Sequence, residues 1–291
     1  MKKRSMGDRI FDAIVYAILV VVFLIVFFPL MYVVSTSFAS ARELALNKFL
    51  IFPKHPTLEV YQYIFSTSTF LRSMIVTIVI TVVGTLVNLV MTCLMAYPLS
   101  RKALPGRSVI MTAVTFTLVF SGGMIPMYLV VNSLGLIDTY TSLILPVAIS
   151  SFNLILVKNF FQEIPESLID AAQIDGSSEM NTLARIVLPL SKPALATFTM
   201  FYAVGHWNQF MQPLLYLNDS KKWTIQILLR QIVLMSQSGV GDEDAMPPGF
   251  VLPVKSLKMA CIVVSTLPII AAYPFMQKYF DKGVMSGSIK G

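Results

Sequence analysis

Six stretches of the chain contain no Asp, Glu, Lys or Arg, and this feature constrains the fold more than any other. Each stretch is long enough to cross a bilayer, because a spanning helix needs about 20 predominantly apolar residues. The six stretches are Ala13–Phe38, Ser73–Ser100, Ser108–Ile137, Thr139–Val157, Pro193–Asn218 and Met259–Gln277. The sequence lacks the alternating segments of a membrane β-barrel, so helices must satisfy the backbone. We therefore predict an all-α, polytopic membrane protein with six transmembrane helices in a single domain, residues 1–291.

The composition excludes a water-soluble globular protein. Hydrophobic residues make up 56% of the chain and charged residues 13%, whereas soluble domains carry about 25% charged residues. The net charge of +7 fits the basic cytoplasmic loops of membrane proteins. Since no basic run with interleaved aromatic residues occurs, we expect no nucleic-acid partner. Cys93 and Cys261 lie in apolar stretches and form no Cys-x-x-Cys pair, so we expect no metal site.

The distribution of basic residues predicts the orientation of the chain. With both termini in the cytoplasm, the inner segments hold 13 of the 22 Lys and Arg residues. The short loop Arg101–Arg107 holds three of them, whereas the opposite loop at Asp138 holds none. We expect both termini, the segment 158–192 and the tail 278–291 to be cytoplasmic. The loops 39–72 and 219–258 would then be extracellular, and a short helix at Trp223–Arg230 would lie on the membrane surface.

The segment between the fourth and fifth stretches, residues 158–192, has a helical pattern. Pro165 suits the start of a helix, Gly176 suits its left-handed end, and Ser177 or Ser178 can cap a second helix. The predicted apolar faces of the two helices are Ile164, Leu168, Ala171, Ala172 and Ile174, and Met180, Leu183, Ala184, Val187 and Leu188. Pro189 and Pro193 then redirect the chain. We predict a helix–turn–helix hairpin.

The first helix of this hairpin is acidic. Glu163, Glu166, Asp170 and Asp175 all belong to it. A helix that lies on anionic lipid is expected to be basic, so the acidic surface favours docking to a protein partner. The alternative is a hairpin that only covers the ends of the bundle.

Two runs of this segment resemble the EAA loop of binding-protein-dependent ABC importer permeases. Asp170-Ala171-Ala172 stands where the family has Glu-Ala-Ala. Three residues separate Ala172 from Gly176, and nine residues separate Gly176 from Ile186-Val187-Leu188-Pro189. Further likenesses cover the rest of the chain. Trp207-Asn208 with Pro213-Leu214 resembles sugar permeases of the MalG type. Phe120–Pro126, Leu134–Leu136 and Lys278–Gly291 resemble the branch of that family containing LplC and YtcP.

The resemblance implies the type I ABC importer permease fold, with residues 158–192 as the cytoplasmic coupling loop. It implies a bacterial plasma membrane, a second MalF-like permease, two ATPase subunits and an extracellular solute-binding protein. The chain has no Gly-x-x-x-x-Gly-Lys-[Ser/Thr] loop. We therefore expect a non-catalytic subunit without a cofactor, with ATP and Mg bound by the partner ATPase.

The resemblance also implies roles for particular residues. Those expected to contact the ATPase through the coupling loop are Glu166, Asp170, Ala171, Ala172, Asp175, Gly176, Leu188 and Pro189. The tail would reach the ATPase interface through Gly283, Gly287 and Lys290. The outer segment 219–258 would meet the loaded binding protein, although its composition equally suits a solvated loop.

Polar residues inside membrane spans are costly and often functional. Aromatic faces combined with amide groups suit sugars, and the candidate pathway residues are Tyr202, Trp207, Asn208, Gln209 and Gln212. The alternative is that these amides join helices by hydrogen bonds. We expect that alternative for Asn88 and Asn153, and a packed, satisfied side chain for His206. The expected solute is an oligosaccharide from a polysaccharide such as pectin or alginate, as the resemblance implies.

Two other functions compete with this interpretation. An intramembrane serine protease could use His206 as its base with Ser73 or Ser150, but no nucleophile motif accompanies them. A secondary transporter should show inverted repeats or interrupted helices in corresponding halves, and neither is evident in the sequence. Both alternatives predict activity without an ATPase.

Overall fold

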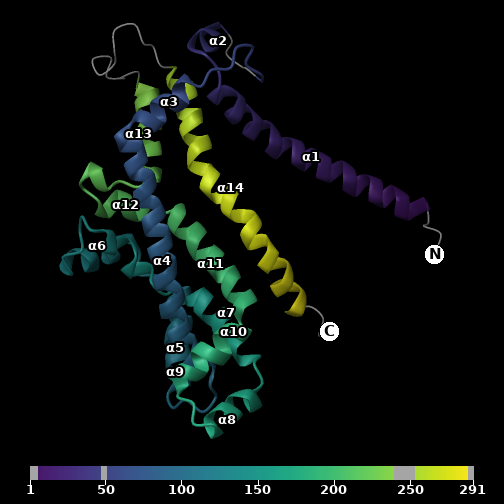
Figure 1. The fold of residues 1–291 in the computed structure, drawn as a ribbon, viewed down its shortest axis with the longest axis vertical. Coiled ribbons are helices and arrows are strands. Elements are labelled where there is room, and N and C mark those ends of the chain that lie inside the picture. Colours follow the sequence, from purple (N-terminus) through teal and green to yellow (C-terminus); the bar gives the residue numbers. More distant parts are fainter. Residues whose placement is uncertain (1–5, 47–50, 239–252, 288–291) are drawn as a thin grey trace. The chain divides into compact units, whose positions relative to one another are not determined.

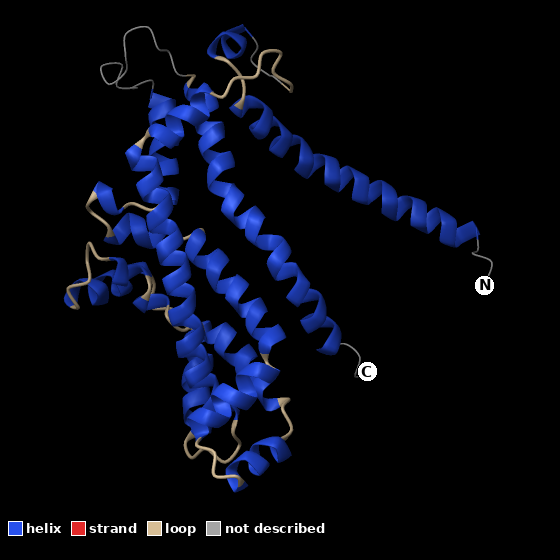
Figure 2. Cartoon of the chain, in the orientation of Figure 1, coloured by secondary structure: helices blue, strands red, loops and turns tan. Residues whose placement is uncertain are grey.

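The computed structural model describes residues 6–46, 51–238 and 253–287, and within these ranges it contains helices and loops but no strand (Figure 2). The predicted all-α class is therefore confirmed. The chain divides into two compact units, residues 1–68 with 229–267 and residues 69–228 with 268–291. Figure 1 labels the helices along the chain.

The first unit contains the N-terminal helix and the segments that follow it. Its elements are α1 (Met6–Ser37), α2 (Ala41–Leu46), α3 (Glu59–Ser66), the later part of α13 (Ile225–Ser238) and the first part of α14 (Val254–Gly287). Residues 39–72, predicted as a loop, thus include two short helices and the start of the next long one. The reason is the spacing of Val60 and Ile64, which lie one helical turn apart and are both buried.

Side-chain hydrogen bonds connect the short helices of this unit to their neighbouring segments. The hydroxyl groups of Ser37 and Tyr61 lie 2.6 Å apart, which joins the end of α1 to α3. Glu43 Oε1 accepts the backbone N–H groups of Lys54 at 2.8 Å and His55 at 2.9 Å. This carboxylate is buried, and it holds Lys54 and His55 against α2.

The second unit contains the remaining elements. They are α4 (Ser68–Ser100), α5 (Arg107–Val119), α6 (Met124–Ser133), η1 (Tyr140–Leu143), η2 (Leu145–Val147), α7 (Ser151–Gln162), α8 (Glu166–Ile174), α9 (Glu179–Thr182), the π-helical turn η3 (Leu183–Val187), α10 (Leu188–Leu190), α11 (Lys192–Trp207), α12 (Met211–Tyr216), η4 (Ser220–Lys222), the start of α13 and the later part of α14. The surface helix predicted at Trp223–Arg230 corresponds to the start of α13.

Three of the apolar segments are bent rather than straight. The chain turns by 118° between α5 and α6, by 53° between Tyr140–Val147 and α7, and by 87° between Glu179–Leu190 and α11. At the first bend α5 ends at Val119, and Gly123 immediately before α6 has φ +87°, a conformation that favours glycine. Interrupted helices, which the sequence analysis did not detect, are therefore present.

Helix length decides which elements can cross a membrane alone. Three helices of the described ranges are long and apolar enough, and up to six spans result if each bent pair counts as one. α5 alone has 13 residues and extends about 20 Å, which is less than the hydrocarbon thickness of about 30 Å. The third apolar stretch is therefore not one straight span, because the chain turns back by 118° between α5 and α6.

A buried core joins the helices of the second unit. Tyr97 and Leu99 of α4, Leu154 and Phe161 of α7, Leu183 and Val187 of η3, and Phe198 and Tyr202 of α11 belong to one cluster. The rings of Phe160 and Phe198 meet edge to face with centroids 6.1 Å apart. The hairpin after α7 thus shares its core with the long helices α4 and α11.

Candidate functional site

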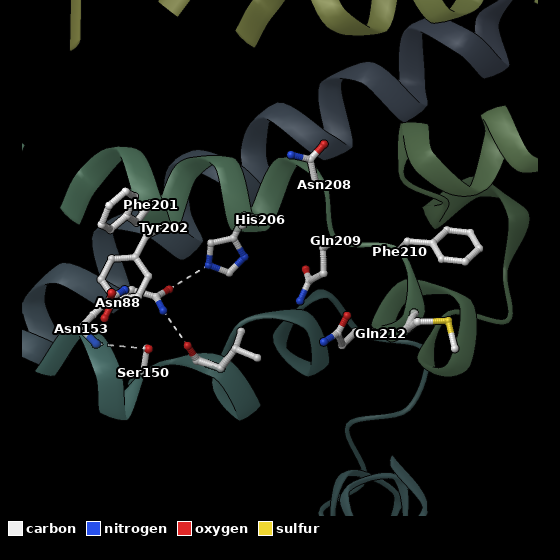
Figure 3. Close-up of a pocket in the computed structure, with 13 residues that line it drawn as sticks. Asn88, Ser150, Asn153, Phe201, Tyr202, His206, Asn208, Gln209, Phe210 and Gln212 are labelled. Carbon is white, nitrogen blue, oxygen red and sulfur yellow. Dashed lines mark hydrogen bonds between the residues drawn. The ribbon is translucent and has the colours of Figure 1, made fainter. Parts of the chain in front are cut away.

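A polar cavity of about 510 Å³ opens between α4, the η2–α7 junction, α11 and the segment after α11 (Figure 3). The residues that line it carry no formal charge. They are Asn88, Val147, Ser150, Asn153, Phe201, Tyr202, Gly205, His206, Asn208, Gln209, Phe210, Met211 and Gln212. Aromatic faces, amides and hydroxyl groups therefore surround this space.

A hydrogen-bonded chain across three elements forms one wall of the cavity. Asn88 Nδ2 of α4 donates to the Val147 carbonyl at 2.6 Å, and Asn88 Oδ1 lies 2.8 Å from Nε2 of His206 on α11. Both links appear as dashed lines in Figure 3. The prediction that Asn88 joins helices is thus confirmed. Among the described residues only Nε2 of His206 has a hydrogen-bond partner, and the side chain of Gln209 lies beside the ring.

Two further contacts fix side chains around the cavity. The hydroxyl groups of Tyr202 and Thr92 lie 2.7 Å apart, and Gln209 Nε2 donates to the Leu143 carbonyl at 3.0 Å. Ser150 caps α7 by accepting the Asn153 N–H. The cavity wall is therefore held by contacts between segments far apart in the sequence.

The structure brings most of the predicted pathway residues together. Tyr202, Asn208, Gln209 and Gln212 line the cavity. Trp207 does not, since its side chain is 5% exposed and packs elsewhere, while its carbonyl accepts a hydrogen bond from Gln226. The sequence analysis did not select Phe201, Phe210 or Met211 for the cavity, because apolar residues in an apolar stretch give no distinguishing signal.

The predicted hairpin is present as α8, a tight turn and the continuous segment α9–η3–α10. Gly176 has φ +78°. Its N–H donates to the Gln173 carbonyl at 3.0 Å, and the Ser177 N–H donates to the Ala172 carbonyl at 2.9 Å. This pair of bonds is the Schellman helix ending. Ser178 caps α9 by accepting the Asn181 N–H. Both predictions for the turn are confirmed.

Contacts on one side of the hairpin attach it to the helices. Tyr97 of α4 donates to Glu179 Oε2 at 2.5 Å, and Gln173 Nε2 donates to Glu179 Oε1 at 2.8 Å. Gln162 Nε2 donates to the Ser100 carbonyl at 3.2 Å. The hairpin therefore lies at the same end of this unit as the basic loop Arg101–Arg107.

The predicted apolar faces of the hairpin are wrong in part. Ile169, Ala172, Leu183 and Val187 are buried, whereas Leu168 is 46%, Ile174 86% and Met180 61% exposed. The reason is that α8 carries apolar residues around more than one face, and only the face spaced by three residues meets the core. Ala172 thus packs within the chain, while Glu166, Asp170, Ala171, Asp175, Gly176 and Pro189 are exposed and Leu188 is half-buried.

The C-terminal tail continues the last helix. α14 runs to Gly287, so the span predicted to end at Gln277 is followed by further helical turns. Gly283 and Gly287 lie on this helix, and Lys290 lies outside the described residues. Most of the loop predicted to meet a binding protein, residues 239–252, also lies outside them.

At the other end of the second unit, Asp138 joins two loops. Asp138 has φ +61°, and its Oδ1 accepts the backbone N–H groups of Asn218 at 3.0 Å and Asp219 at 3.1 Å. Lys222 Nζ lies 2.6 Å from Asp138 Oδ2 and donates to the Asp138 carbonyl. The hydrogen bond from Lys222 is the main reason that the pKa of Asp138 is lowered, and Asp138 in turn raises the pKa of Lys222.

This loop contact predicts a pH-dependent stability difference. A carboxyl whose pKa is lowered on folding stabilises the protein above its unfolded-state pKa, near 3.8, and loses this effect as the pH falls through the lower folded-state pKa. We expect Asp138→Asn, which tolerates the left-handed backbone, to lower the thermal midpoint at neutral pH. The difference from wild type should shrink below about pH 4. A difference that is equal at all pH values would contradict the ionic contact.

The fold and the site together define a class of protein. A helical membrane protein with an uncharged polar cavity and a hairpin exposed at one end fits a transport subunit. Residues 1–286 match the family described as "Binding-protein-dependent transport system inner membrane component". The chain belongs to this family. It is a non-catalytic, multi-pass membrane subunit, which excludes the intramembrane protease.

Individual relatives agree over nearly the full length. The chain is 53% identical to Protein LplC of Bacillus subtilis, over 98% of this chain and 96% of the relative. It is 50% identical to the polygalacturonan/rhamnogalacturonan transport system permease protein YtcP of the same organism, over 98% and 100%. A chain in the crystal structure of a bacterial ABC transporter involved in import of the acidic polysaccharide alginate superposes with a TM-score of 0.90. That match covers 96% of this chain and 100% of the other at 31% identity.

Proposed function

We propose that this protein is a permease subunit of an ATP-driven importer for oligosaccharides derived from acidic polysaccharides. Relatives described as carrying polygalacturonan or alginate support this solute class. The uncharged cavity supports it further, because its amide groups and aromatic rings suit the hydroxyl groups and C–H faces of sugars. A second permease completes the pathway, and an extracellular binding protein delivers the solute.

Coupling to ATP hydrolysis is assigned to the hairpin Pro165–Leu190. This proposal rests on one observation. Leu183 and Val187 fix the hairpin to the core, yet the hairpin exposes Leu168, Ile174 and Met180. Large apolar side chains left exposed on a charged segment outside the membrane favour contact with a protein partner. A partner ATPase, which binds ATP and Mg, is the proposed occupant of this surface, and Asp170 offers it a carboxylate.

The path of the motion follows from the packing. The hairpin turns into α11 at Ser191 with a bend of 87°, and α11 lines the cavity. A displacement of the hairpin would therefore rotate α11 and change access to the cavity. The basic loop Arg101–Arg107 lies at the same end as the hairpin, which supports a cytoplasmic hairpin and cytoplasmic termini in the plasma membrane. The tail, including Gly283, Gly287 and Lys290, is proposed to lie near the ATPase interface.

Purification of the intact transporter tests this function. We expect the chain to co-purify with a second permease and an ATPase, and we expect a binding protein loaded with trigalacturonate to stimulate ATP hydrolysis severalfold. The unloaded binding protein is the control. Transport without an ATPase would contradict the proposal, and stimulation only by unrelated solutes would contradict its solute class.

A further inference from the structure

Two buried polar atoms of the cavity have no hydrogen-bond partner in the described chain. They are Nδ1 of His206 and Oε1 of Gln209. The two side chains are 6% and 9% exposed, and both line the cavity. Figure 3 shows them as neighbours on the same side of it. A buried polar atom without a partner is unfavourable, so these two atoms favour a hydrogen-bonding group that enters the cavity.

The hydrogen bonds of the wall identify what these atoms can do. The carbonyl groups of Val147 and Leu143 only accept, so the side-chain atoms that contact them are the amide nitrogens of Asn88 and Gln209. Asn88 therefore presents its oxygen to His206 Nε2, and Nε2 must carry the proton. In a neutral imidazole this leaves Nδ1 unprotonated.

Both unpartnered atoms are consequently acceptors. His206 Nδ1 offers a lone pair, and so does Gln209 Oε1. Two acceptors cannot satisfy one another, and they need hydrogen-bond donors that enter the cavity. A sugar hydroxyl donates one hydrogen bond, whereas an ionised carboxylate has no proton to donate.

We propose that His206 Nδ1 and Gln209 Oε1 form a subsite that accepts hydrogen bonds from hydroxyl groups of the transported oligosaccharide and excludes its carboxylates. This inference rests on the proposed function and makes it more specific. The subsite fixes the orientation of a uronic acid unit, with ring hydroxyls toward α11. The carboxylates then face other parts of the cavity, where Asn153 and Gln212 carry amide donors.

The protonation of the His206 ring tests the subsite directly. It is measured by NMR on the reconstituted transporter with ¹⁵N-labelled histidine in this subunit alone. The chain has two histidines, so His55→Gln leaves His206 as the only one. Its ¹⁵N NMR spectrum should show Nε2 protonated and Nδ1 unprotonated without sugar. A trigalacturonate-loaded binding protein should shift the Nδ1 resonance and leave Nδ1 unprotonated. A protonated Nδ1 in either state, or an unchanged resonance while ATP hydrolysis is stimulated, would overturn the subsite.

Two substitutions separate the subsite from the structural role of the ring. His206→Gln retains a donor near the Nε2 position, and His206→Asn retains an acceptor near the Nδ1 position. We expect His206→Gln to keep the thermal midpoint and raise the trigalacturonate concentration needed for half-maximal uptake about threefold to tenfold. His206→Asn should lower the thermal midpoint, and it should raise that concentration less than His206→Gln does because it retains the acceptor. The reverse pattern would overturn the proposal.

Failure of the proposed transport function gives a different result from failure of the subsite. If a loaded binding protein stimulates no ATP hydrolysis by the wild-type transporter, the proposed solute or mechanism is wrong. The protonation of His206 in the unliganded transporter then still decides the subsite, because a proton on Nδ1 would convert this acceptor into a donor.

Discussion

Replacing Gly84 by alanine is expected to destabilise the protein by about 2–5 kcal/mol. A Cβ atom at this position of α4 would lie 2.5 Å from Nε2 and 2.6 Å from Cε1 of His206. The ring cannot withdraw freely, because it is buried and Nε2 is bound to Asn88 at 2.8 Å. Either α4 and α11 separate, or the ring leaves Asn88 and the hydrogen bond is lost. Thermal unfolding of the purified protein measures the effect.

A glycine beside the same histidine provides the control. Gly205 lies on α11, and no atom lies within 4 Å of a Cβ built there. Gly205→Ala should therefore leave stability equal to wild type or raise it slightly, because alanine favours a helix over glycine by about 0.5–1 kcal/mol.

A second variant tests the physical cause of the Gly84 effect. Removing the ring in Gly84→Ala/His206→Ala should restore part of the stability lost in Gly84→Ala, since the two sites are in contact and are not additive. A stable Gly84→Ala protein would contradict the close approach of the two helices.

The sequence predicts where the helices of this protein lie along the chain better than it predicts which face of each helix is buried. Charge-free stretches locate the apolar helices because hydropathy depends on composition alone. Gly123 lies in the break between α5 and α6 inside such a stretch, and hydropathy does not register its φ of +87°. The turn at Gly176 was predictable because a helix ending is a local property of the chain.

For the cavity, too, the sequence predicts residue types but not the contacts between residues far apart in the chain. Tyr202, Gln209 and Gln212 are recognisable as polar or amphipathic groups in an apolar stretch. The contact between Asn88 and His206 is not recognisable in the sequence, because 118 positions separate the two residues. On the hairpin, Ile169 rather than Leu168 is buried, since tertiary packing selects one of several apolar faces.

Replacing Gly176 by arginine is expected to reduce sugar uptake more than tenfold while ATP hydrolysis by the complex continues. Gly176 lies at the exposed turn of the hairpin, and no atom of the described residues lies within 4 Å of a Cβ at this position. An arginine here extends outward, where the proposed ATPase contact lies. It would displace that contact and disconnect hydrolysis from movement of α11. Uptake by cells and hydrolysis by the purified complex measure the two quantities.

Gly106 supplies a control with matched backbone strain. Its φ is +75° against +78° at Gly176, and neither position has an atom within 4 Å of a Cβ. Gly106→Arg and Gly176→Arg should therefore carry the same backbone cost, about 1–2 kcal/mol, and the same added charge. Only Gly176→Arg should lose uptake at equal levels of complex. Equal loss in both variants would attribute the defect to strain and contradict the hairpin contact.

Ile174 tests the same surface without strain. Its side chain is 86% exposed, so Ile174→Ser should leave the stability of the isolated chain unchanged within about 0.5 kcal/mol. In the assembled transporter the same change removes an apolar contact from the interface with the ATPase. Uptake should fall, and the ATPase should dissociate more readily during purification. Because Ile174 contributes little to the fold, a loss of this kind identifies a partner surface, whereas normal uptake would place the ATPase contact elsewhere.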